Sequence, residues 1–520
     1  MTATTAPAAP AARARPPRVT LPGPARLLRL ELRRSIMPWL LPLFAVLFWF
    51  ATYRPAMDNP PFWNVRSGIV QSHTMLAFAP LLAGAAAWTG SRERRRGVAD
   101  LVGVSALPRW AAQLAAWLAT TCWAEAVYLA GVAVLYGVTA HQVAWGGPLL
   151  WPVAVGAAFV AASCALGFAA GTLLPSRFTA PLAAFVMFLA LAGGAFALQA
   201  NITYAEIWPL NVQGAFPADA YGIFYPYLPD LPIAQLMFLG GLAVAALGGL
   251  GLPTAAGGRS LRIAAAAVTA TGLATAGTAV ALAGTARLEP HGIVIPALHD
   301  AASDRPTPYT PVCAHTAIPI CLHPAHRLLL PDVTAAFGPV LSQIAGLPGA
   351  PVRVTEVAVT SVHAEPSNGI ALGGPALGGH PPVLYLPLAG MTLPGQGTAF
   401  SITENLRQQD GPWILSLLVG LPGQLGAVTG VNVIPDVAPG HSAQLAVLDG
   451  LVRALGLAGP GPQGAGIPGS GTPRGTSTGS PRELAAAQRF AALPAAARHA
   501  WLMTHLAALR AGQISVSEIP

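Results

Sequence analysis

Seven long apolar stretches in the first 285 residues constrain this chain more than any other feature of its sequence. Each is close to the roughly 20 residues that an α-helix needs to cross a bilayer. They cover residues 36–53, 69–89, 110–138, 149–173, 179–200, 232–252 and 263–285. The expected fold class is therefore mainly α: a polytopic membrane helix bundle with about seven transmembrane helices, followed by a C-terminal extracytoplasmic α+β domain. The fourth and fifth stretches are so close together that they predict a tight helical hairpin.

The composition fits a chain whose outer surface faces lipid. Hydrophobic residues make up 53% of the 520 residues and charged residues only 9%, whereas a soluble domain carries about 25% charged residues. All 28 basic side chains are arginine, so the chain has neither a P-loop lysine nor a Schiff-base lysine. It is therefore not expected to be a conventional P-loop ATPase by itself. The arginines form no patch with base-stacking aromatics, so no nucleic-acid partner is expected.

The placement of the arginines predicts the orientation of the bundle. The N-terminal segment and the connections after the second, fourth and sixth stretches hold 15 arginines. The connections after the first, third and fifth stretches hold two, Arg54 and Arg66. The positive-inside rule then places the N-terminus in the cytoplasm. An odd number of spans in the plasma membrane places everything beyond residue 285 on the extracytoplasmic side.

Two segments precede the first apolar stretch. Residues 1–24 are rich in Ala, Pro and Arg, and they predict a disordered cytoplasmic tail. Residues 25–35 alternate leucines with arginines in a pattern that suits an amphipathic helix on the inner leaflet. A simple basic flank of the first span explains the same pattern, and both interpretations remain open.

The sequence after the last apolar stretch divides into three parts. Residues 286–457 contain Val- and Tyr-rich segments together with a helical one, so they predict the folded extracytoplasmic domain. The apolar run 412–432 is interpreted as part of the core of this domain. Residues 458–481 are almost wholly Gly, Pro, Ser and Thr and predict a flexible linker. Residues 482–520 predict a helical segment that packs on the domain or on the membrane surface.

The segment 91–109, SRERRRGVADLVGVSALPR, joins the second and third spans on the predicted cytoplasmic side. Here the sequence resembles the membrane subunits of ABC exporters, the type-two ABC permease family, over roughly residues 25–255. A Glu-Arg-rich loop with a glycine and an apolar-Pro-Arg entry into the third span carry the resemblance: Glu93, Arg94, Arg95, Arg96, Gly97, Ala106, Leu107, Pro108 and Arg109. The family's amphipathic N-terminal helix and re-entrant outer loop would correspond to 25–35 and the aromatic-rich connection 201–231.

The resemblance implies the permease subunit of an ATP-driven exporter, working as a homodimer or heterodimer in the lipid bilayer with a separate ABC ATPase subunit. The quoted loop residues would then form the coupling element that docks on this subunit; otherwise they act only as a positive-inside anchor. ATP and Mg²⁺ would bind the partner, and this chain would hold no cofactor. The seventh span, 263–285, and the domain after it lie outside the family's six-helix core in 25–255. The alternative function is a membrane-anchored extracytoplasmic binding or sensing protein.

A few side chains carry chemistry of their own. Glu125 is the one acidic residue deep within a predicted span, where ionisable groups are costly and often functional. It either lines a substrate path or braces the bundle through a hydrogen bond. Cys313 and Cys321 predict a disulfide in an oxidising compartment. A competing metal site would use these thiolates with His315, His323 and His326. No recognisable catalytic motif is present, so no enzyme is expected.

Overall fold

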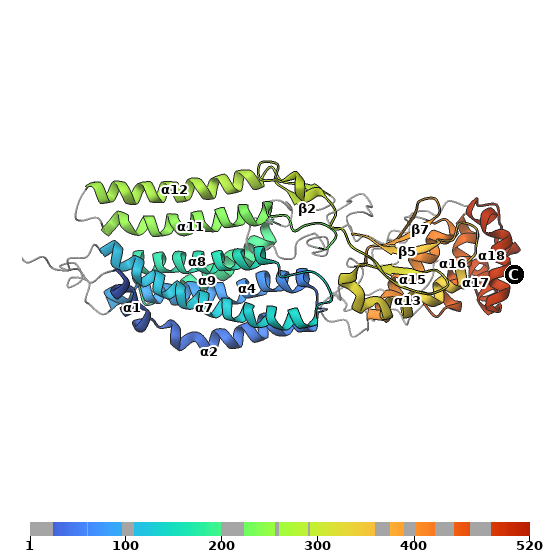
Figure 1. Cartoon of the computed structure of the whole chain (residues 1–520), viewed down its shortest axis with the longest axis horizontal. Coiled ribbons are helices and arrows are strands. Elements are labelled where there is room, and N and C mark those ends of the chain that lie inside the picture. The colour runs from blue at the N-terminus through green and yellow to red at the C-terminus, as the bar shows by residue number, and fades with distance from the viewer. Residues whose placement is uncertain are drawn as a thin grey trace, which may run out of the picture.

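The molecule is elongated, with a bundle of long helices at one end and a smaller α+β domain at the other (Figure 1). This computed structural model describes residues 24–59, 61–95, 109–198, 223–254, 259–289, 292–358, 375–388, 402–421, 441–457 and 480–520. The predicted tail, nearly all of the predicted linker and most of the aromatic-rich connection 201–231 lie outside these residues.

Six helices in the described part of the chain are long and apolar enough to cross a membrane. The first is composite, because α2 (Met37–Phe48) continues through a π-helical turn (Trp49–Tyr53) into α3 (Arg54–Asp58). The other five are single α-helices: α4 (Trp63–Gly90), α7 (Arg109–Gln142), α8 (Leu150–Leu173), α11 (Asp230–Thr254) and α12 (Arg259–Ala283).

The expectation of about seven spans is confirmed in part. The remaining stretch forms α9 (Thr179–Leu198), a continuous apolar helix that packs against α4 and α8. Its described apolar part, Thr179–Ala192, is shorter than the six membrane-length helices. Residues 174–178 join α8 to α9, as the predicted hairpin requires.

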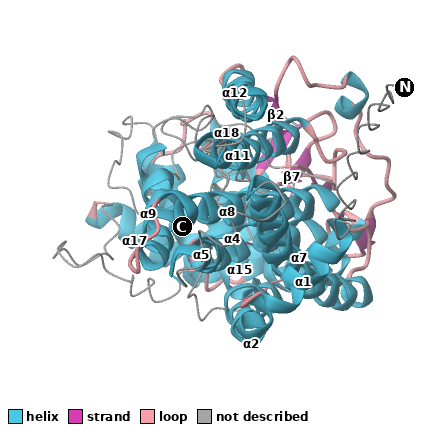
Figure 2. Ribbon diagram, turned by 90° about the vertical axis from the view of Figure 1, so that its left-hand side faces the viewer, coloured by secondary structure: helices cyan, strands magenta, loops and turns pink. Residues whose placement is uncertain are grey.

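Small residues determine how closely the bundle helices approach. α8 is the central helix. In its apolar 18-residue segment 61% of the residues are buried, whereas only 22% are buried in the first span and in α12. The end-on view shows α8 between these two (Figure 2). A Cβ atom at Gly167 would lie 2.2 Å from the carbonyl oxygen of Ala83, and one at Gly171 would lie 2.0 Å from that of Ala87. Membrane helices associate through such contacts because lipid supplies no hydrophobic force between them.

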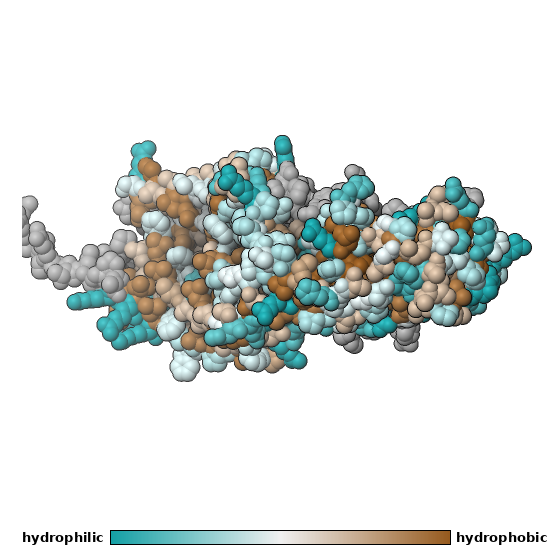
Figure 3. Space-filling view, turned by 45° about the vertical axis from the view of Figure 1, so that its right-hand side comes forward, coloured by the Kyte–Doolittle hydropathy of each residue, from teal (hydrophilic) through white to brown (hydrophobic). Residues whose placement is uncertain are grey.

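Charged side chains gather at the end of the bundle that is remote from the α+β domain. This end, called the basic end below, carries α1 (Pro24–Arg34), α5 (Arg92–Arg95) and the start of α12 (Figure 1). The surface between this end and the domain carries many hydrophobic residues (Figure 3). α1 and the domain lie at opposite ends of the bundle (Figure 1).

The C-terminal domain is built on a five-stranded mixed sheet with the strand order β3-β4-β5-β7-β6. β4 pairs in parallel with β5 and β5 with β7, whereas the two edge strands are antiparallel. The strands are β3 (Val312–Ala314), β4 (Ile320–Leu322), β5 (Arg353–Glu356), β6 (Ala376–Gly378) and β7 (Val383–Leu386). A separate two-stranded hairpin, β1 (Arg287–Glu289) and β2 (Gly292–Val294), follows α12 directly.

In the described part of this domain, five helices accompany the sheet: α13 (Leu330–Ile344), α15 (Ile402–Val419), α16 (Ser442–Ala454), α17 (Pro481–Ala492) and α18 (Ala495–Arg510). Of these, α13 and α15 contact its strands, and α16, α17 and α18 pack on other helices. Short 3₁₀ helices cover Ala301–Asp304, Pro324–Leu329 and Val516–Glu518. One hydrophobic core joins strands and helices that are far apart in the sequence, including Phe337, Val354, Leu415, Phe490 and Leu502. The C-terminal helices therefore pack on the domain, and the apolar run that begins near residue 412 contributes to its core.

Candidate functional site

At the basic end of the bundle, α1 is held firmly against its neighbours. Oε2 of Glu31 pairs with Nη2 of Arg92 at 2.8 Å. The indole N–H of Trp123 in α7 donates to the backbone carbonyl of Leu32 at 3.0 Å. The amphipathic segment is thus connected both to α7 and to the start of the arginine-rich connection.

The described arginines of that connection differ in whether they contact other parts of the chain. Arg95 donates to the carbonyl of Trp88 at 2.6 Å, and its guanidinium lies 3.4 Å from the centroid of the same indole ring. Arg109 lies 3.8 Å from Glu93, which ties α5 to the start of α7. Arg94 is exposed and forms no ion pair with any described residue. Four of the predicted coupling residues, Arg96, Gly97, Leu107 and Pro108, lie outside the described part of the chain.

Glu125 lies near the middle of α7, beside α8. Its Oε2 atom is buried and has no hydrogen-bond partner among the described residues. Gln113, Trp117 and Thr121 precede it at four-residue intervals, so all four side chains share one side of the helix. The polar atoms Gln113 Oε1 and Trp117 Nε1 are also buried without a partner in the described structure. A brace through hydrogen bonding would need a partner for Glu125, and the described residues supply none.

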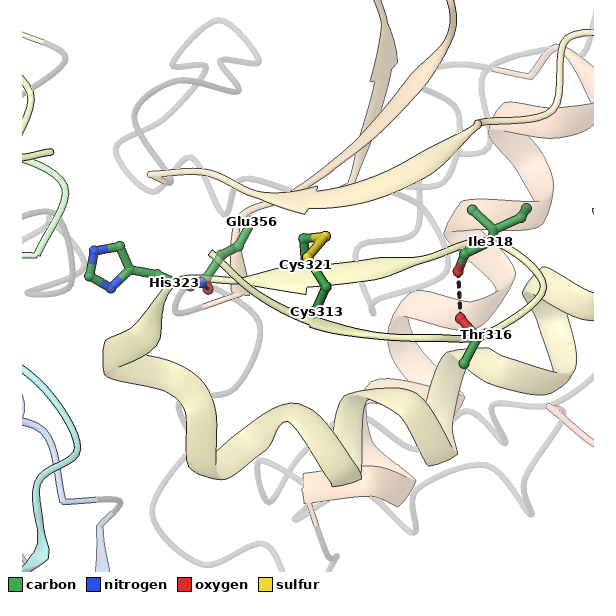
Figure 4. The surroundings of a disulfide bond; sticks show 6 residues. All are labelled: Cys313, Thr316, Ile318, Cys321, His323 and Glu356. Atoms are coloured by element: carbon green, nitrogen blue, oxygen red, sulfur yellow. Dashed lines mark hydrogen bonds between the residues drawn. A yellow bond between two sulfur atoms is a disulfide. The ribbon is translucent and has the colours of Figure 1, made fainter. Parts of the chain in front are cut away.

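The predicted disulfide is confirmed. Cys313 of β3 and Cys321 of β4 face each other in the antiparallel register and are covalently joined (Figure 4). The bond consumes both thiolates, so neither sulfur can act as a thiolate ligand of a metal. His315 lies just beyond β3 and is exposed. No group of three or more His, Cys, Asp or Glu side chains is placed to hold a metal within the described residues.

His323 and His326 are organised around a buried carboxylate, Glu356 at the end of β5. The backbone N–H of His323 donates to Oε2 of Glu356 at 2.6 Å, and Nδ1 of His326 contacts Oε1. The side chains of His326 and Glu356 are each only 1% exposed. Sequence reasoning missed Glu356 because it is separated from the histidines by 30 residues. An acidic residue that ends a Val-rich strand was the available signal.

The ring of His323 points away from the sheet, toward the bundle (Figure 4). Its centroid lies 4.1 Å from that of Tyr309, 4.5 Å from that of Trp145 and 5.1 Å from that of Phe224. Trp145 belongs to the connection between α7 and α8, and Phe224 precedes α11, so the ring joins the domain to the bundle. Nδ1 of His323 accepts from the N–H of Ala325 at 3.1 Å. The proton of the neutral ring therefore sits on Nε2, which has no hydrogen-bond partner in the described residues.

We expect this histidine to make the junction sensitive to acid. Burial, together with the nearby His326, lowers the pKa of His323 to about 3, against about 6.5 in an unfolded chain. The unfolded state therefore binds a proton that the folded state rejects, and stability falls as the pH drops below about 6.5. At pH 5 the loss reaches at most about 2 kcal/mol. The test is thermal unfolding of the full chain at pH 7 and at pH 5. The thermal midpoint should fall less between these two pH values in His323→Phe than in the wild type. In the control His315→Phe, which changes an exposed histidine, it should fall as much as in the wild type. An equal fall in all three proteins would show that His323 does not cause the acid sensitivity.

A small hollow, partly open to solvent, lies beside the same junction. It is lined from the start of α4, from the connection between α7 and α8, and from Ile223 and Ala325. Phe62, one of the α4-side residues, also packs its ring 4.5 Å from that of His326. The bundle and the domain therefore meet through aromatic side chains around a small space.

Comparisons with known proteins do not assign the chain to a family. No family model matches it, no curated protein matches it, and no solved structure matches it.

Proposed function

We propose that this chain is the membrane-spanning permease subunit of an ATP-driven ABC-type exporter, and that a separate ATPase subunit docks at the basic end of its bundle. The N-terminus would then lie in the cytoplasm and the C-terminal domain outside the plasma membrane. The observation that carries the proposal is the construction of the basic end, where a short arginine-rich helix is braced against the long helices.

A coupling element has to transmit force, so it must move as one piece with the helices that open the path. α5 meets this need because it follows α4 after a single residue and pairs with α7 through Glu93 and Arg109. Arg92 and Glu31 extend the same unit to α1. A push on α5 would therefore reach α1, α4 and α7 together.

Within α5, Arg94 is the arginine that forms no ion pair with a described residue. Its exposed guanidinium suits a carboxylate on the docking surface of an ATPase, because arginine binds carboxylates through two parallel hydrogen bonds. The braces formed by Arg92, Arg95 and Arg109 hold the unit in shape, so their loss would alter its fold as well as its docking.

The test exchanges the charge of Arg94. We expect Arg94→Glu to reduce, at least about tenfold, the amount of ATPase that co-purifies with the full chain, because like charges at an interface cost several kcal/mol. Each P-loop ATPase encoded by a neighbouring gene would be co-expressed with the chain, and the chain would carry the affinity tag. Thermal unfolding should be unchanged, since Arg94 has no internal partner in the described structure.

Arg353→Glu is the matched control, because Arg353 is exposed on β5 of the C-terminal domain. It makes the same charge exchange far from the basic end and should leave co-purification intact. The proposal fails if the wild-type chain retains no ATPase, or if both variants retain as much as the wild type.

A further inference from the structure

Glu125 lies at the border between the buried and the exposed sides of α7. Leu118 lies seven residues before Glu125, Cys122 lies three before it, and Leu129 lies four after it. These spacings place the three side chains on the same side of the helix as Glu125. These three side chains are exposed, the leucines by 40% and 47%. In a membrane this face meets lipid. Oε2 of Glu125 is buried, while the residue as a whole is only half-buried. The carboxyl group can therefore be reached from the side of the bundle.

No counter-charge meets this carboxyl group in the described structure. Arg109, at the start of α7, pairs with Glu93, and Arg66, buried in α4, donates to Ala56 and Thr139. A carboxylate within a membrane is costly unless a cation pairs with it. The position thus offers an acidic side chain that an incoming cation would pair with.

The neighbouring polar atoms suit the head group of an amine. Ser163 of α8, adjacent in the sequence to Cys164, has a buried Oγ with no partner among the described residues. Oγ1 of Thr121, one turn before Glu125, is also buried without a partner among the described residues. Tyr128, by contrast, is already used, because its hydroxyl donates to the carbonyl of Val153 at 3.1 Å. Hydrogen-bonding capacity is therefore left over beside the carboxylate.

We infer that the face of α7 around Glu125 binds a lipophilic amine that enters from the bilayer. The ammonium group pairs with the Glu125 carboxylate, and the apolar tail lies along Leu118, Cys122 and Leu129. The inference rests on the proposed exporter function in one respect, because it names amphiphilic amines as the class of substrate. Binding itself requires no ATPase.

The experiment measures binding by the purified full chain in lipid nanodiscs without any ATPase. The probes are a fluorescent dodecylammonium and a dodecanol with the same fluorophore, which differ only in charge. Glu125→Gln should weaken binding of the ammonium probe at least about tenfold and leave binding of the alcohol unchanged. Glu125→Asp should retain part of the ammonium binding. Asp449→Asn, which removes one carboxylate from the domain surface, should bind both probes as the wild type does.

Three outcomes would overturn the inference. The first is equal ammonium binding by Glu125→Gln and the wild type, and the second is a wild type that does not prefer the ammonium over the alcohol. The third is a change in oligomeric state in Glu125→Gln without a change in probe preference, which would make this face a contact between two copies. Thermal unfolding of each variant checks that it is folded. If the chain binds the ammonium probe through Glu125 but no ATPase co-purifies, it is an amine-binding membrane protein and the proposed exporter function fails. If an ATPase co-purifies but Glu125 does not bind the probe, the chain exports another class of substrate.

Discussion

Replacing Gly171 with alanine is expected to force α8 away from α4 and to destabilise the whole bundle. The new Cβ atom would lie 2.0 Å from the carbonyl oxygen of Ala87 and 2.7 Å from its Cα. These are backbone atoms of a neighbouring helix, so no side chain can rotate to make room. Overpacking in a rigid core costs about 1–3 kcal/mol and more where the backbone has to shift. We expect a loss of roughly 3 kcal/mol and a fall in the thermal midpoint of about 5 °C.

Gly240 of α11 provides the matched control, because it is exposed and a Cβ atom there would have nothing within 4 Å. Gly240→Ala should be neutral or slightly stabilising, since alanine is favoured over glycine in helices by about 0.5–1 kcal/mol. Thermal unfolding and gel filtration in one detergent compare the two variants. Equal stability of Gly171→Ala and Gly240→Ala would show that α4 and α8 are not in contact at this point.

The positions of the long helices could be predicted because their signal is local. Apolar composition over about 20 residues is readable without any tertiary information, and the stretch 149–173 became α8 at Leu150–Leu173. The first span extends beyond its expected end at residue 53. Its helix passes through the π-helical turn and over Arg54 to Asp58, so the helix outlasts the apolar run by which it was recognised.

The contacts at the candidate sites could not be predicted in the same way. The disulfide could be predicted, because an even pair of cysteines eight positions apart is itself a sequence signal. The ring cluster around His323 unites Trp145, Phe224 and Tyr309, which belong to three separate segments of the chain. Arg94 likewise looks the same in the sequence as Arg92 and Arg95. Only tertiary contacts distinguish Arg94, which forms no ion pair with a described residue, from the arginines that do contact other parts of the chain.

Replacing Asp230 with asparagine is expected to loosen the joint between α11 and the segment after β2. Asp230 is fully buried, and its Oδ2 accepts from the N–H of Ile295 at 2.9 Å and lies 3.2 Å from Nδ1 of His299. An asparagine keeps the shape but loses the charge that strengthens both contacts. Hydrogen bonds to charged groups contribute about 1.5–3 kcal/mol, so we expect a loss of about 2 kcal/mol. Hydrogen exchange at Ile295 and thermal unfolding both measure it.

Asp304→Asn is the control for this change, because Asp304 also contacts His299, through Nε2 at 2.9 Å, but its side chain is 43% exposed. Exposed ion pairs contribute about 0.2–1 kcal/mol, so its loss should be smaller and should leave the exchange of the Ile295 N–H unchanged. Equal effects of the two variants would place the joint elsewhere.

The same pair gives the joint a defined response to pH. Burial by itself would lower the pKa of His299, but the hydrogen bond to Asp304 and the charges of Asp230 and Asp304 outweigh it and raise the pKa above its usual value. A histidine whose pKa is raised on folding stabilises the folded state below about pH 6.5, and this stabilisation is lost as the pH rises through the folded pKa. The difference in thermal midpoint between the wild type and Asp230→Asn should therefore narrow between pH 6 and pH 9. A gap that stays constant over this range would mean that His299 does not take part in the joint, and that the contact with the Ile295 N–H supports it alone.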